Sequence, residues 1–299
     1  MKAVRIDAFG GPEVLHEAEV DTPVPGHGQV RVRVRAVGVN PFDSKVRSGA
    51  MQTVFNTPLP AILGLEVAGV VDATGTGVTG FAVGDEVFGW SDTGAYAQYA
   101  LATRIALKPA GLAWDTAVGL PVAGETAERV LDLLKVTSGE TLLIHGAAGA
   151  VGTVAVQLAI ARGATVIGTA SGANYQYLAS LGATPTTYGD GLVARVRALA
   201  PNGVDAVFDV AGKGALPDSI ELRHGTDRIV TIADPSAFGL GVVFSSGGGT
   251  VDLAALADRA VKGELVVAIE GKYALADVAV AHRVIEGGHA RGKLVLTVD

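Results

Sequence analysis

The sequence predicts an α/β protein with two domains, one built on a doubly wound parallel sheet and one on a small antiparallel β-barrel. Three observations support this fold class. A glycine-containing turn joins an apolar strand-like run to an apolar helix-like run between residues 142 and 157. Strand-like and helix-like segments then alternate as far as residue 232, whereas residues before 115 form short strand-like segments separated by turn signals. The first pattern, strands alternating with helices, is typical of a parallel sheet, and the second, short strands separated by turns, is typical of an antiparallel sheet.

The first hundred residues predict the antiparallel barrel. Residues 31–35 alternate arginine with valine, which is the pattern of a strand with one buried and one solvated face. Further strands are predicted at 67–73, 86–88 and 95–100, and turn signals such as Gly84-Asp85 separate them. Because a solvated strand face explains the three arginines, we assign them no function.

The turn after residues 141–145 is the strongest functional signal. Gly146, Gly149 and Gly152 allow a tight bend, close approach of a phosphate and close helix packing. The helix that follows directs free N–H groups and the positive end of its dipole towards the turn. The spacing alone is weak evidence in a chain with 41 glycines, and a purely structural turn is the alternative.

The segments downstream strengthen the interpretation as a dinucleotide site. Strands are predicted at 165–169, 204–209 and 228–232, and helices at 174–181, 192–199 and 215–222. Alternation of buried strands with helices predicts a parallel sheet covered on both faces. The glycine turn therefore lies where doubly wound sheets bind dinucleotides.

The end of the second predicted strand favours NADP over NAD. An NAD site usually places a carboxylate there to bind the ribose 2′-hydroxyl, but residues 169–175 read Thr-Ala-Ser-Gly-Ala-Asn-Tyr and contain none. Ser171, Asn174 and Tyr175 are able to donate hydrogen bonds to a 2′-phosphate. No Arg or Lys lies in this segment, so the preference rests on neutral donors.

Composition excludes several other classes of function. Hydrophobic residues make up 49% of the 299 residues and the formal net charge is −7, so there is a core of substantial size and no electrostatic basis for binding nucleic acid or an anionic membrane. Without cysteine, no disulfide, thiol nucleophile or Cys-ligated metal can form. The charged N-terminus and the lack of a long apolar run predict a cytoplasmic protein.

Several segments, taken in order, resemble the zinc-independent quinone oxidoreductase branch of the medium-chain dehydrogenase/reductase superfamily. No single segment is unique to that branch, but their order is specific and spans nearly the whole chain. The matching residues are 38–43 (GVNPFD), 47–49 (RSG), 63–71 (LGLEVAGVV), 83–87 (VGDEV), 120–123 (LPVA), 126–127 (TA), 148–152 (AGAVG) and 286–296 (EGGHARGKLVL).

This resemblance implies a GroES-like catalytic domain formed by residues 1–115 and 256–299. It implies an inserted Rossmann NADP-binding domain at 116–255, and a last strand at 293–298 that returns to the first domain. It further implies a homodimer, as is common in the family.

Two positions depart from the zinc-dependent relatives. Asn40 stands where those enzymes have a cysteine ligand, and their Gly-His-Glu reads Gly64-Leu65-Glu66 here. Neither Asn nor Leu is an ordinary zinc ligand, and the chain lacks the cysteines of a structural zinc lobe. We therefore expect no metal. Without a Lewis acid to stabilise an alkoxide, we expect hydride transfer from NADPH to an electrophilic acceptor such as a quinone or a conjugated enone.

The resemblance implies catalytic positions at Asn40, Asp43 and Thr126. Asn40 and Thr126 are expected near the nicotinamide, although Thr126 is equally consistent with an ordinary helix residue. Asn40 needs a polar partner because its amide lies in an apolar segment. Asp43 has either a hydrogen-bonding role nearby or only that of a carboxylate at a helix N-terminus. Relatives often carry a substrate-facing tyrosine where this chain has Val46, so the proton is left to water or a ribose hydroxyl, or the substrate differs from a simple quinone.

The remaining site residues belong to the predicted Rossmann domain. The loop is expected to bind the pyrophosphate, Tyr188 to lie over the adenosine phosphate region, and the segment 242–244 to approach the nicotinamide carboxamide. The expected cofactor-binding residues are Ala148, Gly149, Ala150, Val151, Ser171, Tyr175, Tyr188 and Phe244. Among the histidines, we expect His145 to be structural, and His282 and His289 to lie on the surface.

Two alternatives remain open. An enoyl or enone reductase would reduce a carbon–carbon double bond with the same cofactor. A redox sensor that binds NADPH without catalysis is compatible with the missing tyrosine. The first alternative gives a saturated ketone as product, and the second gives no acceptor-dependent oxidation of NADPH.

Overall fold

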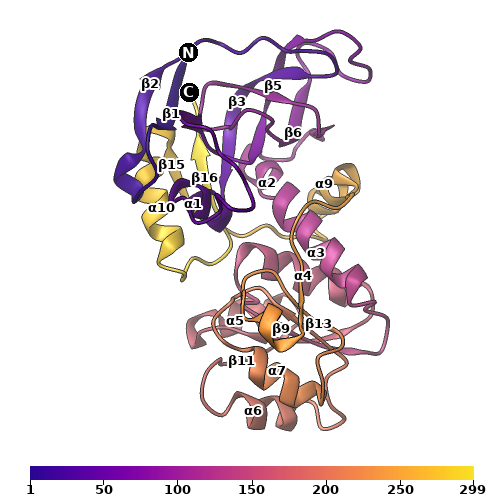
Figure 1. Cartoon of the computed structure of the whole chain (residues 1–299). Helices are drawn as coiled ribbons and strands as arrows, with labels where there is room; N and C mark the ends of the chain where they lie inside the picture. Colours follow the sequence, from indigo (N-terminus) through magenta and orange to yellow (C-terminus); the bar gives the residue numbers. More distant parts are fainter. The chain divides into compact units, whose positions relative to one another are not determined.

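The computed structural model describes residues 1–299 (Figure 1). The chain divides into two compact units, with Met1–Pro121 and Asp252–Asp299 forming unit 1 and Val122–Val251 forming unit 2. The predicted boundaries at 115/116 and 255/256 fall inside α2 (Trp114–Val118) and α9 (Leu253–Val261). Both helices stay in unit 1, because α2 packs against β3 and β5 and α9 packs against β8.

Unit 1 contains two sheets, which are mostly antiparallel, as predicted for this part of the chain. One has the strand order β15-β16-β3-β5-β6-β8 with β7 paired to β3, and the other has the order β2-β1-β4. All pairings are antiparallel except that of β15 with β16. The strands are β1 (Lys2–Ile6), β2 (His16–Glu19), β3 (Val30–Val39), β4 (Ala61–Ile62), β5 (Glu66–Thr74), β6 (Glu86–Trp90), β7 (Tyr99–Ala102), β8 (Ile105–Leu107), β15 (Ile269–Ala274) and β16 (Lys293–Thr297). With α2 and α9, the helices are α1 (Pro41–Arg47) and α10 (Val278–Glu286).

Strand β3 shows why the arginine–valine alternation correctly predicted a strand with one buried and one solvated face. Val32 and Val34 face the core, and Arg31 turns outwards to pair with Asp72 of β5 at 2.8 Å. From Ala36 to Val39 every residue is buried, because there β3 lies between β16 and β5. The expected last strand is thus confirmed as β16.

The strand predicted at 95–100 is wrong in its first half. Ala95 and Tyr96 are fully buried but irregular, because their N–H groups bond to the carbonyls of Gly64 and Leu63. The regular strand begins only at Tyr99. Apolar residues here fill the core from a loop, which their pattern does not distinguish from a strand.

Unit 2 is a doubly wound domain, and the predicted fold class is confirmed. Its parallel sheet has the order β11-β10-β9-β12-β13-β14, so the chain runs outwards from β9 in one direction and then returns to run outwards in the other. The strands are β9 (Thr141–His145), β10 (Thr165–Thr169), β11 (Thr184–Thr186), β12 (Ala206–Asp209), β13 (Ile229–Thr231) and β14 (Val243–Phe244). The helices are α3 (Pro121–Leu133), which begins at the last residue of unit 1, α4 (Ala150–Ala161), α5 (Tyr175–Ser180), α6 (Leu192–Leu199), α7 (Leu216–Arg223) and α8 (Ala237–Leu240).

Three short 3₁₀ turns complete the elements, at Pro12–Val14, Gly172–Asn174 and Leu275–Asp277.

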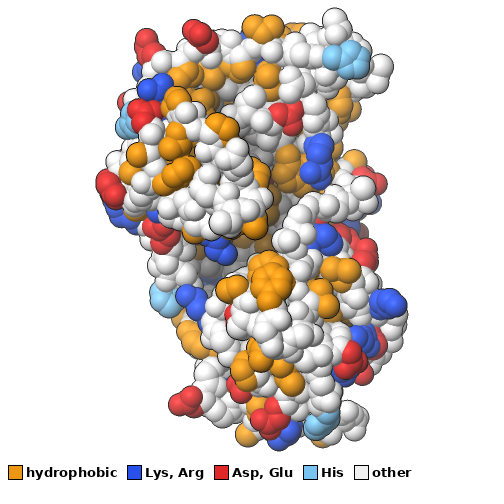
Figure 2. Space-filling view, viewed as in Figure 1, with side chains coloured by type: hydrophobic (Ala, Val, Ile, Leu, Met, Phe, Trp, Pro, Cys, Tyr) orange, Lys and Arg blue, Asp and Glu red, His pale blue; other side chains and the backbone are white.

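Acidic and basic side chains are interspersed over the face seen in Figure 2. None of the helices combines the length and the apolar character that crossing a membrane requires.

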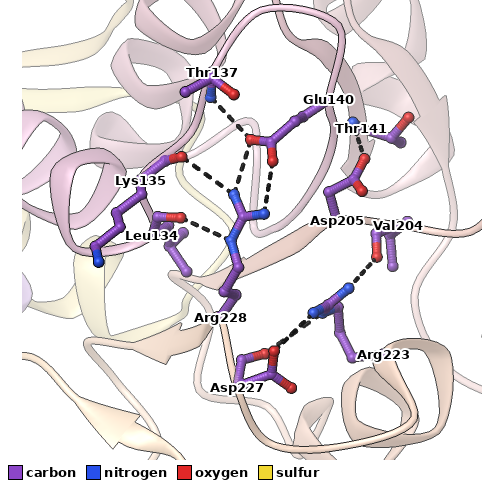
Figure 3. A network of polar contacts seen from close by, with 10 residues as sticks. All are labelled: Leu134, Lys135, Thr137, Glu140, Thr141, Val204, Asp205, Arg223, Asp227 and Arg228. Carbon is purple, nitrogen blue, oxygen red and sulfur yellow. Dashed lines mark hydrogen bonds and ion pairs between the residues drawn. The ribbon is translucent and has the colours of Figure 1, made fainter.

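The amino ends of the unit 2 strands are held by a polar network (Figure 3). Arg228 binds both oxygens of Glu140, at 2.6 and 2.8 Å, and the carbonyl of Leu134 at 2.9 Å. Glu140 also accepts from the N–H of Thr137, and these contacts, led by that with Arg228, lower the pKa of Glu140 to about 2. The network ties the residues that precede β9 to the residue that precedes β13, at the edge opposite the glycine turn.

Candidate active site

The turn after β9 has the geometry of a phosphate site. Gly146 has φ +73°, in the left-handed region that favours glycine. A Cβ at Gly152 would lie 2.3 Å from the Gly146 carbonyl oxygen, so this glycine is required for close packing. A Cβ at Gly149 would meet nothing nearer than that same oxygen at 3.5 Å. The packing of the protein therefore leaves open space at Gly149.

This open space lies at the N-terminus of α4, where Gly149 is the N-cap residue. No side chain caps the helix, and its first turn contains no acidic residue. The N–H groups of Ala150 and Val151 therefore lack an intrahelical partner and a side-chain acceptor, which is the condition for anion binding at a helix start. The site residues Ala148, Gly149, Ala150 and Val151 fit a dinucleotide pyrophosphate.

The end of β10 carries the residues expected to select the cofactor. Ser171 lies just before a 3₁₀ turn, and its hydroxyl accepts a hydrogen bond from the Asn174 amide at 3.3 Å. Tyr175 begins α5 directly afterwards and is partly exposed. The structure thus brings all three polar side chains onto one turn, free of carboxylates.

Tyr188 follows β11, and its side chain is 55% exposed. The guanidinium of Arg195 binds the carbonyls of Thr187 and Asp190 at 3.0 and 2.7 Å, which fixes the shape of this loop. Because β11 is parallel to β10, Tyr188 lies at the same edge of the sheet as Ser171.

His145 is buried at the carboxyl end of β9, where its ring nitrogens contact the hydroxyls of Ser219 and Thr169 at 3.0 and 3.4 Å. Burial lowers the pKa of His145 to about 4, so the ring is neutral. Its neighbour Asp209 accepts from the N–H groups of Ala211 and Gly212. These contacts give both residues structural roles, and that of Asp209 is absent from the sequence interpretation.

A second unpredicted network lies between α3 and the loop after β14. Glu125 accepts from Arg129 at 2.7 Å and from the N–H of Gly249 at 2.5 Å, and Arg129 donates to the hydroxyl of Ser245. Thr126 is buried, and its hydroxyl donates to Glu125 at 3.3 Å. Glu125 thus connects Thr126 to the segment that follows Phe244.

Phe244 ends β14, and its ring stacks on Phe238 with the centroids 5.2 Å apart. Its side chain is therefore packed within unit 2.

In unit 1, the Asn40 side chain lies between two buried charges. Its Nδ2 donates to Glu66 at 2.9 Å, and its Oδ1 accepts from the Lys293 ammonium at 2.7 Å. Lys293 also forms an ion pair with Glu66. All three residues are at most 5% exposed. The polar partner expected for Asn40 is thus a buried ion pair, which also fixes the orientation of the amide.

Gly38 makes room for this arrangement. A Cβ on Gly38 would lie 2.2 Å from a Glu66 carboxylate oxygen and 2.7 Å from Lys293 Cε. Any side chain there would displace the ion pair.

Asp43 lies in the first turn of α1 and accepts from the Asn40 N–H at 2.8 Å, so its helix-terminal role is real. It is 2% exposed, and burial raises the pKa of Asp43 to about 7 against the opposing effects of the Asn40 N–H and Lys293. Such a carboxyl group is neither fully ionised nor fully protonated near neutral pH.

Asp43 also lines a pocket of about 340 Å³ that lies wholly within unit 1. Phe42 and Phe55 form one wall, with their rings edge to face at a centroid distance of 5.2 Å. Val46, which stands in place of the tyrosine common in related enzymes, contributes an apolar side chain to the lining. The pocket thus combines an aromatic and aliphatic side with polar groups. Its other lining residues are Asn56, Thr57, Pro58, Pro60, Ala61, Ile62, Leu63, Gly64, Leu65, Ser91, Asp92, Thr93 and Gly94.

His282 is the clearest error of the sequence interpretation, because it is fully buried rather than on the surface. Its Nδ1 lies 3.0 Å from the Arg47 guanidinium, and its Nε2 lies 2.8 Å from the Tyr96 hydroxyl. Burial, and secondarily the Arg47 charge, lower the pKa of His282 to about 3. His289 is exposed, as expected.

Comparisons with known proteins agree with the fold. The model of the alcohol dehydrogenase GroES-like domain matches residues 26–131, and that of the zinc-binding dehydrogenase family matches residues 150–248. A quinone oxidoreductase of Pseudomonas aeruginosa is 33% identical over 99% of each chain. A 2-methylene-furan-3-one reductase of Solanum lycopersicum is 31% identical over 99% of this chain and 79% of its own length.

Solved structures give the same result. The quinone oxidoreductase of Coxiella burnetii superposes with a TM-score of 0.90 at 32% identity, over 100% of this chain and 99% of that one. A mycobacterial protein in complex with NADPH gives 0.86 at 29% identity, covering 99% and 100%. An NAD-dependent alcohol dehydrogenase gives 0.87 at 30% identity and covers 100% of both chains.

A GroES-like unit joined to a nicotinamide-cofactor domain defines an oxidoreductase. This chain belongs to the medium-chain dehydrogenase/reductase superfamily, as a member of quinone oxidoreductase type.

Proposed function

We propose that the protein transfers hydride from NADPH to a quinone or a similar electrophilic carbonyl compound, without zinc. The observation that carries this proposal is the combination of an uncapped α4 N-terminus with a carboxylate-free turn at the end of β10. The first suits the pyrophosphate and the second suits a 2′-phosphate. When bound, the cofactor supplies the hydride.

The protein's own residues hold the two ligands. The loop residues Gly149, Ala150 and Val151 bind the pyrophosphate, while Ser171 and Tyr175 donate to the 2′-phosphate. The acceptor enters the pocket of unit 1, where Phe42 and Phe55 offer flat apolar contact and exclude water. An aromatic wall suits the planar ring of a quinone.

The buried ion pair supports a reaction without zinc. At Asn40, the residue that replaces a cysteine ligand of zinc-dependent relatives, the amide oxygen is already engaged by the Lys293 ammonium. Glu66 is neutralised by that same ammonium. A divalent cation would have to displace Lys293, and an amide and a leucine offer it poor ligands.

A spectrophotometric assay tests the proposal. NADPH and NADH are supplied separately, at matched concentrations, with a benzoquinone, a naphthoquinone or a simple enone, and the absorbance of the reduced cofactor is followed. Rapid loss of NADPH with a quinone, unchanged by metal chelation, is the expected result. A preference for NADH, or activity that zinc restores after chelation, contradicts the corresponding part of the proposal.

Reduction of an enone double bond is the second candidate. The similarity to a 2-methylene-furan-3-one reductase favours it. An acid in the pocket serves both reactions, because a quinone and an enone each take up one proton with the hydride. Product analysis separates the two: a quinone gives hydroquinone and an enone gives a saturated ketone. Cofactor binding without any acceptor reduction would instead favour a redox sensor.

We further propose a homodimer that forms through the edge of the unit 2 sheet. Strand β14 is an edge strand, and the side chains of Val243 and Phe238 beside it are 52% and 76% exposed. Unpaired edge strands and exposed apolar groups favour association. Sedimentation analysis tests this, because a V243K variant should be a monomer under conditions where the wild type is a dimer.

A further inference from the structure

The proposed reaction leaves negative charge on the reduced acceptor, and two carboxyl groups line the pocket that receives it. Asp92 is exposed and accepts from Gln29 and Thr103. Asp43 is 2% exposed. A buried carboxyl group keeps its proton to higher pH than an exposed one, which makes Asp43 the candidate donor.

The polar chain behind Asp43 has a definite direction. A guanidinium only donates hydrogen bonds, so Arg47 must donate to Nδ1 of His282 across their 3.0 Å contact. The neutral ring therefore carries its hydrogen on Nε2, and it donates this hydrogen to the Tyr96 hydroxyl oxygen at 2.8 Å. The hydroxyl hydrogen of Tyr96 is then free to point away from His282.

Asp43 interacts with this hydroxyl. Burial raises the pKa of Tyr96 well above 10, and charge and hydrogen-bonding interactions with Asp43 raise it further. Tyr96 is fully buried, so water does not compete for its hydroxyl. Arg47 is in turn held by Glu286 at 2.5 Å and by the Gly10 carbonyl at 3.1 Å.

The charges that face Asp43 come from several elements. Lys293 of β16 favours the ionised carboxylate, whereas Glu66 of β5 and burial favour the protonated acid. On α1 itself, the Asn40 N–H favours the ionised form. Tyr96 interacts with Asp43, Arg47 acts on Tyr96, and His282 is neutral. With a pKa of about 7, Asp43 exists in both forms near neutral pH.

Resting on the proposed function, we propose that Asp43 is the acid that protonates the reduced acceptor, and that Tyr96, oriented by His282 and Arg47, positions and tunes it. After a hydride reaches the acceptor, the O–H bond of the Asp43 acid breaks and its proton passes to the anionic oxygen of the hydroquinone or enolate. The carboxylate that remains regains a proton from water in the pocket. Asp43 thus supplies the donor missing at Val46.

The first test measures the carboxyl group itself. The protein is labelled with ¹³C at its aspartate carboxyl carbons and titrated by NMR, and D43N identifies the resonance. We expect that resonance to titrate near pH 7 and to move upwards by about one pH unit in Y96F, because a lost donor disfavours the ionised form. A resonance that titrates near 4, or one unmoved in Y96F, overturns the proposal.

The second test measures kcat against pH for the best acceptor. We expect wild-type kcat to fall as pH rises through about 7. In Y96F this fall, called here the alkaline limb of the pH profile, should move to higher pH. In D43N the alkaline limb should disappear, and kcat should drop by roughly 10²-fold or more. The control D115N makes the same change in the first turn of α2, where Asp115 caps Thr116 outside the pocket, and should leave the profile unchanged.

The outcomes separate the two proposals. Wild-type turnover with a limb that persists in D43N overturns the role of Asp43 and leaves the proposed function standing. If Y96F loses kcat equally at all pH values and its alkaline limb does not move, Tyr96 has only a structural role. That result overturns the proposal that Tyr96 adjusts the pKa of Asp43. No acceptor-dependent oxidation of NADPH by the wild type overturns both.

Discussion

The Lys293 ammonium donates to the amide oxygen of Asn40 across 2.7 Å, although 253 positions separate the two residues in the chain. This contact joins the start of α1 to the start of β16. It sets the orientation of the Asn40 amide, since Oδ1 faces the ammonium and Nδ2 faces Glu66.

Replacing Lys293 with methionine should destabilise unit 1 by about 3–5 kcal/mol, because Glu66 is then buried without its partner. The double variant K293M/E66Q should recover part of this loss. Both tryptophans, Trp90 and Trp114, lie in unit 1, so their fluorescence during urea unfolding reports this unit alone. If K293M alone unfolds at the wild-type urea concentration, the ion pair has no structural role.

The glycines of the β9–α4 turn should respond differently to an added methyl group. G152A should cost unit 2 about 1–3 kcal/mol, because its Cβ would lie 2.3 Å from the Gly146 oxygen. G149A should change stability by less than about 1 kcal/mol but weaken NADPH binding at least about tenfold, because the methyl enters the phosphate space. Circular dichroism and cofactor titration measure the two effects. Unweakened binding by G149A would argue against a phosphate site there.

A carboxylate at Ser171 should reverse the cofactor preference. S171D is expected to weaken NADPH binding by about tenfold or more, because it repels the 2′-phosphate, and to improve the relative binding of NADH. Fluorescence titration with each cofactor measures the ratio. The control S180D adds the same charge at the exposed last residue of α5 and should leave the ratio unchanged. Equal effects in both variants would reduce the result to net charge.

The Glu140–Arg228 pair should make unit 2 sensitive to acid. The pKa of Glu140 is about 2 in the folded protein and 4.5 ordinarily, so its stabilisation is complete above pH 4.5 and is lost as pH falls through 2. E140Q should cost about 1–3 kcal/mol at pH 7, and this difference should shrink towards pH 2. The exposed pair Glu221–Arg197 provides the control, since E221Q should change stability by less than about 0.5 kcal/mol. Circular dichroism follows unfolding at each pH.

Most of unit 2 could be predicted because its signals are local. The helix predicted at 192–199 agrees residue for residue with α6, and the glycine turn lies where expected. Strand alternation and helix periodicity depend on neighbours a few positions apart. They need no knowledge of the tertiary fold.

The residues behind the site could not be predicted in this way. His282 reads as a polar residue on an amphipathic helix, but Tyr96 and Arg47, which cover it, lie 186 and 235 positions away. Lys293 similarly reads as an ordinary charged residue at the start of a strand. A polar residue that is buried by distant partners leaves no periodic signal, and only the fold shows that these charges meet.

The position of β16 has a consequence for biosynthesis. Strands β15 and β16 belong to unit 1, and β16 fills the place between β15 and β3, yet all of unit 2 is translated before them. The nascent parallel-sheet unit can fold while β3 still lacks its neighbour and Glu66 its counter-charge. Unit 1 is therefore expected to mature last, after its final strand leaves the ribosome, and until then its open sheet edge is the part of the chain most in need of a chaperone.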